Sequence, residues 1–202
     1  MNRRDLLKQG GLAAVGLMGV TATAAAQTAS PAALHAVWVH GSSVEVEDTA
    51  VLNATRRLGW GTVFSGKPGK FAWFHINIPT PVIVNDVRAV LEKVFIFYKT
   101  DGASIRNVHF WDGPHQIKAF DGLMLTGDRS GGIVATNSWA ITPAATMRYG
   151  LGLSIGVQYS IGFDSAITTD ILFTTAGADF RLATPAEVED RVRMTPPVRR
   201  VP

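Results

Sequence analysis

Apolar and polar positions alternate along most of the chain after residue 36, with the period of two that predicts half-buried β-strands. The most regular stretch is 151–159, where large apolar side chains take one face and Gly, Ser and Gln take the other. Short clusters of Asp, Gly and Pro separate such stretches and predict tight turns, as at Asp101-Gly102. The pattern predicts an all-β fold, an antiparallel β-sandwich or jelly roll of about nine or ten strands.

Two stretches need a further argument. Residues 87–93 have spacing that also suits a helix, but the following "VFIFY" is β-branched and aromatic, so we expect a central strand over residues 88–99. Gly150, Gly152 and Gly156 share one face of the regular strand. Because glycine weakens a strand interior, this row indicates the close approach of an aromatic ring or a ligand.

The two ends of the chain differ from its middle. Residues 1–26 combine a charged start, a short apolar run diluted by Gly and Ala, and small residues near Ala26, which is the layout of an export signal. Its Arg3-Arg4 pair resembles the twin-arginine type. We expect a linker over 27–35, the sandwich over 36–180, and a disordered Pro- and Arg-rich tail over 181–202. The mature protein would then be periplasmic or extracellular, with no transmembrane anchor after signal removal.

The composition and the distribution of charge argue against several classes of function. The chain has 202 residues, of which 47% are hydrophobic and 17% charged, so it can bury one core. The leader carries +2 of the formal +3, residues 181–202 carry another +2, and residues 27–180 therefore carry about −1. This distribution argues against nucleic-acid binding, which needs a basic patch on the folded domain. The absence of cysteine excludes disulfides, zinc–thiolate sites and Cys nucleophiles.

Tryptophan and histidine recur two residues apart in three of the predicted strands, in "VWVHG", "AWFHI" and "NVHFWD". Residues two apart in a strand share a face, and the intervening positions are apolar. Each strand should therefore bury one face and present Trp, His and Asn on the other. If the three strands are neighbours in one sheet, these side chains form a continuous platform.

Three interpretations of that platform remain open. It is a second layer of the core, with the indole and imidazole nitrogens bonded internally. It is an open binding face for a small molecule or a glycan, with the candidate residues Trp38, Trp73, Asn77, Asn107, Trp111 and Asp112. It is a metal-dependent enzyme site holding a divalent transition metal, with the candidate ligands His40, His75 and His109. A subunit interface of a self-assembling homo-oligomer is a further possibility.

The motifs "VWVHG", "WFHINIPTP", "VHFWDGP" and "GLGLSIGV" occur in that order. As a set they resemble a family of small bacterial β proteins of unknown function, over roughly residues 36–160. The resemblance implies the fold and makes His40, His75, His109 and Asp112 worth testing, but it implies no activity. We predict an exported, non-catalytic binding protein with its ligand on the Trp/His platform.

Overall fold

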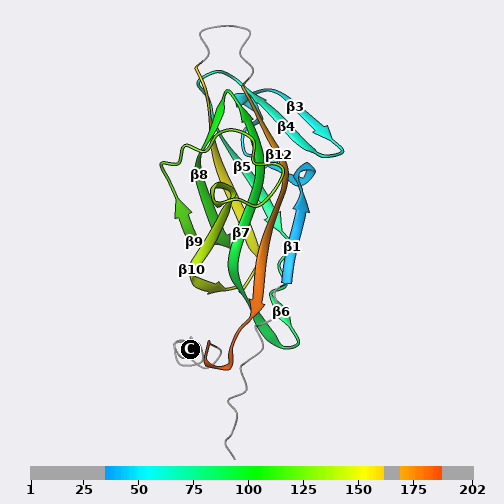
Figure 1. Cartoon of the computed structure of the whole chain (residues 1–202), viewed down its shortest axis with the longest axis vertical. Helices are drawn as coiled ribbons and strands as arrows, with labels where there is room; N and C mark the ends of the chain where they lie inside the picture. The colour runs from blue at the N-terminus through cyan, green and yellow to red at the C-terminus, as the bar shows by residue number, and fades with distance from the viewer. Residues whose placement is uncertain (1–34, 162–168, 188–202) are drawn as a thin grey trace, which may run out of the picture. The chain divides into compact units, whose positions relative to one another are not determined.

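The computed structural model describes residues 35–161 and 169–187, which form twelve strands in two antiparallel sheets (Figure 1). The predicted all-β sandwich is therefore confirmed. Two of the twelve strands are only two residues long, which accounts for most of the difference from the nine or ten expected. The predicted export signal, the linker up to residue 34, and residues 188–202 of the predicted tail lie outside the described residues.

The larger sheet has seven strands and is organised around two long ones, β7 and β12, which pair along nearly their whole length. Its main path is β10 (Ser138–Thr146), β7 (Val87–Asp101), β12 (Asp170–Leu182), β4 (Gly61–Gly66) and β3 (Leu52–Leu58), with β1 (His35–His40) on β12 and β6 (Ile83–Val84) on β7. The ambiguous segment 88–99 is thus a strand, as its β-branched and aromatic residues predicted. Because β4 and β1 pair with successive parts of β12, both lie on the side of β12 opposite to β7.

The smaller sheet has five strands in an unbroken order: β2 (Glu45–Val46), β5 (Phe71–Ile78), β11 (Leu151–Tyr159), β8 (Ala103–Asp112) and β9 (His115–Phe120). The strand β11 is central, and it separates the two Trp/His strands β5 and β8. The short 3₁₀ turn η1 (Gly41–Ser43) carries the chain from β1 in the larger sheet to β2 in the smaller one.

The core lies between the sheets and is filled from the inward-facing positions of both. In β5 the buried residues are Ala72, Phe74, Ile76 and Ile78, and in β11 every second residue from Leu151 to Tyr159 is buried. Burying one such aliphatic or aromatic side chain stabilises the fold by about 1.5–3 kcal/mol. The alternation that fills the core necessarily directs the intervening side chains outward, and this is what creates the Trp/His face.

The last strand extends beyond the expected end of the domain. β12 continues to Leu182, and residues 185–187 are helical. Arg181 donates to Glu92 Oε1 at 2.7 Å and to both carboxylate oxygens of Glu187 at 2.7 and 2.8 Å. None of the described helical segments is long and apolar enough to cross a membrane.

Candidate functional site

The outer face of the five-stranded sheet carries rows of side chains set by the strand register. Over residues 152–156 of β11 the outward residues are small, and on β5 and β8 they are large. We call this surface the Trp/His face, and define it by Gly152, Ser154 and Gly156 in the centre, Trp73, His75 and Asn77 on β5, and Asn107, His109 and Trp111 on β8. Six of these nine positions were expected from the sequence to face a ligand or a metal.

Each central residue lies directly between two of the large ones. Ser154 pairs with His75 on one side and with His109 on the other. Gly156 lies in the same way between Trp73 and Asn107, and Gly152 between Asn77 and Trp111. Laterally paired side chains are only about 4.5–5.5 Å apart at Cβ. The two Trp/His strands therefore present one surface across β11, although they are not neighbours.

The glycines of β11 have different surroundings. A Cβ at Gly156 would lie 2.6 Å from the Phe71 ring and 2.9 Å from Asn107 Oδ1, so an aromatic ring does approach this glycine closely. A Cβ at Gly152 would have no atom nearer than 3.9 Å. This open end adjoins a depression of about 270 Å³ that Asn77 and Tyr149 also line. The face is thus filled by Phe71 at one end and hollow at the other.

A chain of hydrogen bonds crosses the face through His75. Its Nε2 lies 3.2 Å from Glu47 Oε2, and its Nδ1 lies 3.1 Å from Ser154 Oγ. A carboxylate only accepts, so Nε2 carries a proton, and in the neutral form of the ring the Ser154 hydroxyl donates to Nδ1. This arrangement leaves the lone pairs of the Ser154 oxygen available as acceptors toward the outside.

A second network lies on the β8 side. Both His109 Nε2, at 2.7 Å, and Asn107 Nδ2, at 2.5 Å, donate to Asp121 Oδ1. These hydrogen bonds hold the pKa of the exposed Asp121 carboxyl below its ordinary value. The His109 ring also lies 5.1 Å from the Trp73 ring, between centroids. The network therefore fixes the orientation of an imidazole beside an indole, a rigid arrangement suited to contacting a ligand.

Glu47, His75 and Ser154 are the residue types of a nucleophilic triad, but their setting does not suit acyl transfer. That chemistry needs free N–H donors aimed at the developing oxyanion. Ser154 is in the middle of a central strand, whose backbone forms ladders with β5 on one side and β8 on the other. We therefore interpret this chain of hydrogen bonds as a polar network on the outer face of the sheet, and not as a catalytic triad.

Two of the predicted site residues lie on the other sheet, so the predicted platform is formed by two Trp/His strands and not by three. Trp38 and His40 are on β1, in the seven-stranded sheet. The Trp38 indole covers Gly177 and stacks on Phe95 at 5.3 Å, and His40 bonds to its neighbour Ser42. The sequence pattern identified the outward face of each strand correctly, but it contains no information on which sheet a strand joins.

The same placement removes the predicted metal centre. His75 and His109 flank Ser154, whereas His40 belongs to the other sheet, so the three imidazoles do not converge. Across residues 35–161 and 169–187, no group of three or more His, Asp or Glu side chains is arranged to hold a metal ion.

Asp112, a predicted ligand-binding residue, has a structural role. Its side chain is buried, and its two oxygens accept the backbone N–H groups of Arg148, Tyr149 and Gly150 at 2.8, 2.8 and 3.0 Å. The carboxylate thereby closes the loop between β10 and β11. Three donors to a single carboxylate leave it little capacity to bind a ligand.

The exposed Trp60 was not predicted from the sequence, because no histidine or strand pattern accompanies it. It lies in the β3–β4 turn with 57% of its surface exposed. It borders a hollow of about 210 Å³ on the seven-stranded sheet, together with Arg56, Lys99, Asp170 and others. The only available signal was an apolar ring between two glycines in a turn.

Comparisons with known proteins place the chain in a family but supply no activity. The model of a family of unknown function, DUF6623, matches residues 32–181. None of the curated proteins matches. Among solved structures, the chain is similar to CBM29_1, a family 29 carbohydrate binding module from Piromyces equi, with 10% sequence identity and a TM-score of 0.32. That match covers 71% of this chain and 90% of the module. The score is too low for the module's ligand to be transferred.

Proposed function

This chain belongs to DUF6623, a family of unknown function, and we propose from its own geometry that it is a non-catalytic protein that binds glycan-like ligands on the Trp/His face. The observation that carries the proposal is the pairing register of β11. It sets small central residues between two rows of aromatic, imidazole and amide side chains.

The aromatic part of the face suits the apolar side of a sugar. A pyranose ring exposes a flat patch of C–H groups, whose partial positive charge is attracted to the electron-rich face of an indole. Trp73 and Trp111 are both partly exposed and flank the central strand from opposite sides. A ligand that enters at the open Gly152 end can therefore contact Trp111 and reach the exposed part of Trp73, which packs against Phe71.

The polar part of the face suits the hydroxyl groups. The carboxylates of Glu47 and Asp121 and the Ser154 oxygen supply acceptors, while the amide of Asn77 supplies donors. Ligand pockets combine such positioned polar groups with aromatic walls. The two networks hold their members in place before a ligand arrives, which reduces the entropy cost of binding.

The expected cellular location is consistent with this function. We propose that residues 1–26 direct export and are removed, which brings the Trp/His face into contact with glycans outside the cytoplasm. Amino-terminal sequencing of the secreted protein tests this step, with cleavage after Ala26 as the expected result.

The test of the function is a calorimetric titration of the purified protein with soluble hexasaccharides of glucose, xylose and mannose, with Trp73→Ala and Trp111→Ala as variants. We expect binding of at least one hexasaccharide, weakened tenfold or more in each variant, because covering an aromatic side chain contributes about 1.5–3 kcal/mol. Trp60→Ala is the matched control, since it removes an equally large exposed ring from the other sheet, and it should leave binding unchanged within twofold.

Two results would overturn the proposal. The first is no binding of any hexasaccharide at millimolar concentration. The second is binding that Trp60→Ala abolishes and Trp73→Ala does not, which would transfer the site to the seven-stranded sheet. Gel filtration of the same samples separates a subunit interface from a ligand site: a large species that Trp73→Ala dissociates would mean that the Trp/His face is covered by a second copy.

A further inference from the structure

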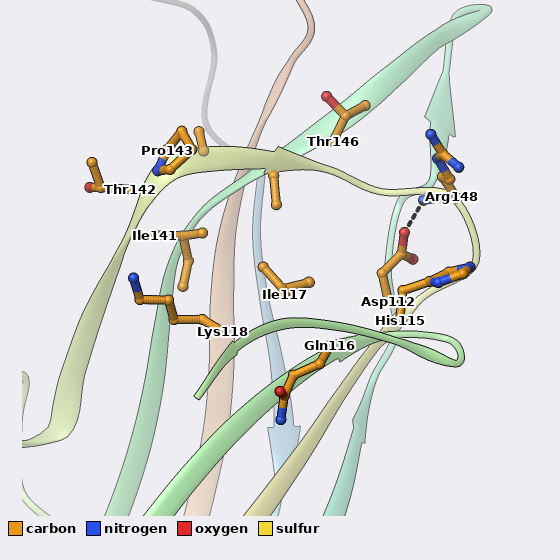
Figure 2. A pocket seen from close by; sticks show the side chains of 12 residues that line it. Asp112, His115, Gln116, Ile117, Lys118, Ile141, Thr142, Pro143, Thr146 and Arg148 are labelled. Atoms are coloured by element: carbon orange, nitrogen blue, oxygen red, sulfur yellow. Dashed lines mark hydrogen bonds between the residues drawn. The ribbon is translucent and has the colours of Figure 1, made fainter. Parts of the chain in front are cut away.

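A third hollow, of about 340 Å³, lies where the edges of the two sheets meet (Figure 2). It is bordered by β9, an edge strand of the five-stranded sheet, and by β10, an edge strand of the seven-stranded sheet. We call it the edge groove, and define it by Asp112, His115–Lys118, Ile141–Thr146 and Arg148. It is distinct from the Trp/His face, with which it shares no residue.

The groove exists because β10 is irregular. Ala140 pairs with Lys93 and Ala145 with Leu91, so the four residues between them face only one residue of β7. An excess of residues on one strand makes it bulge away from its partner. The displaced segment includes Thr142 and Pro143, which form one wall of the groove in Figure 2.

The floor of the groove is apolar. Ile141 is almost fully buried, and Ile117 and Ala145 pack against the core from the two edge strands. In Figure 2 the side chains of Ile117 and Ile141 lie in the space between β9 and β10. A volume near the lower limit for small-ligand pockets, about 300 Å³, admits an apolar body of modest size.

The rim of the groove is cationic. Lys118 lies near Ile141, and Arg148 lies at the other end beside His115 and Asp112 (Figure 2). Neither Lys118 nor Arg148 has an ion-pair partner among residues 35–161 and 169–187. The Asp112 carboxylate in the same lining accepts three backbone N–H groups, so its oxygens are directed at the loop before β11. Two exposed cations against this one buried carboxylate give the rim a net positive charge, which favours an anionic group there.

We propose that the edge groove binds a small amphipathic anion, with an aliphatic or aromatic body on Ile117 and Ile141 and a carboxylate or sulfonate facing Lys118 or Arg148. The apolar floor contributes affinity through burial of the body. The two cations select the sign of the head group, because electrostatic complementarity mainly discriminates between ligands. This inference stands apart from glycan binding and does not depend on it.

The test is displacement of 1-anilinonaphthalene-8-sulfonate, itself an apolar body with a sulfonate, from the full-length folded protein. We expect octanoate to displace the dye at a concentration at least tenfold lower than octanol or octylamine. The three competitors share one chain length and differ only in the head group. Equal potency of octanoate and octanol would overturn the proposal, because the cations would then play no part.

Charge reversal locates the site. The double variant Lys118→Glu, Arg148→Glu should weaken octanoate at least tenfold and make octylamine the better competitor. Lys93→Glu, which reverses a charge on the outer face of the seven-stranded sheet, is the control and should change octanoate binding less than twofold. Both replaced side chains are exposed, and an unchanged melting temperature verifies folding. Unchanged octanoate binding in the double variant would refute the site, whereas Trp73→Ala should leave it intact.

Discussion

The Asp112 carboxylate allows a quantitative test of how the loop before β11 is held. Asp112→Ala removes the acceptor of three backbone N–H groups, at 2.8, 2.8 and 3.0 Å. A hydrogen bond to a charged group contributes about 1.5–3 kcal/mol, so three fully buried ones would total about 5–9 kcal/mol. Two of the three donors belong to exposed residues, where water replaces part of the loss. We therefore expect a destabilisation of about 3 kcal/mol.

The assay is urea unfolding followed by tryptophan fluorescence, with thermal unfolding in parallel. A loss of about 3 kcal/mol lowers the melting temperature by about 6–12 °C in a domain of this size. Asp112→Asn keeps one acceptor oxygen and should cost about half as much. Asp121→Ala removes an exposed carboxyl, whose hydrogen bonds water can replace, and should cost much less than Asp112→Ala. If Asp112→Ala costs no more than Asp121→Ala, the loop is held by other contacts and the assignment of Asp112 is wrong.

Two further predictions concern packing and pH. Gly177→Ala should destabilise the fold by about 1–3 kcal/mol, because a Cβ there would lie 2.5 Å from ring atoms of Trp38. Gly152→Ala is the control: a Cβ there would have no atom nearer than 3.9 Å, so the free energy of unfolding should change by less than about 0.5 kcal/mol. Equal effects of the two substitutions in urea unfolding would contradict the close approach at Gly177. Hydrogen bonds from Arg181 lower the pKa of Glu187 to about 2, so the stabilisation they provide should be fully present above the ordinary value of 4.5 and lost as the pH falls toward 2. Carboxyl NMR titration should show this midpoint, and a midpoint near 4.5 would mean that the pair does not form in solution.

Local pattern was sufficient for much of the fold. The alternation in residues 151–159 predicted a strand with one buried face, and the β-branched and aromatic run within 88–99 outweighed its helical spacing. Both predictions depend on residues next to one another in the chain. Strand ends were less predictable, since β12 passes the expected boundary at 180 on account of partners that are remote in sequence.

The sequence predicted which residues of each strand face outward, but not which strands lie together in one sheet. Period-two spacing placed Trp73 with His75, and His109 with Trp111, on outward faces. The sheet to which each strand belongs depends on long-range pairing, which is why Trp38 was grouped with them wrongly. The burial of Asp112 was likewise invisible, because its donors are more than thirty residues away.

The pairing of β1 with β12 has a consequence for how the protein is made. The first described strand finds its ladder partner only in the last one, and β4 and β7 depend on that same strand. Until β12 has been synthesised, β1, β4 and β7 each have an edge whose backbone N–H and C=O groups lack their ladder partner. Pairing these edges with β12 must close loops of many residues. The larger sheet is therefore completed only after β12 has been made, and slowly, and until then its open edges are available to chaperones or to other nascent copies.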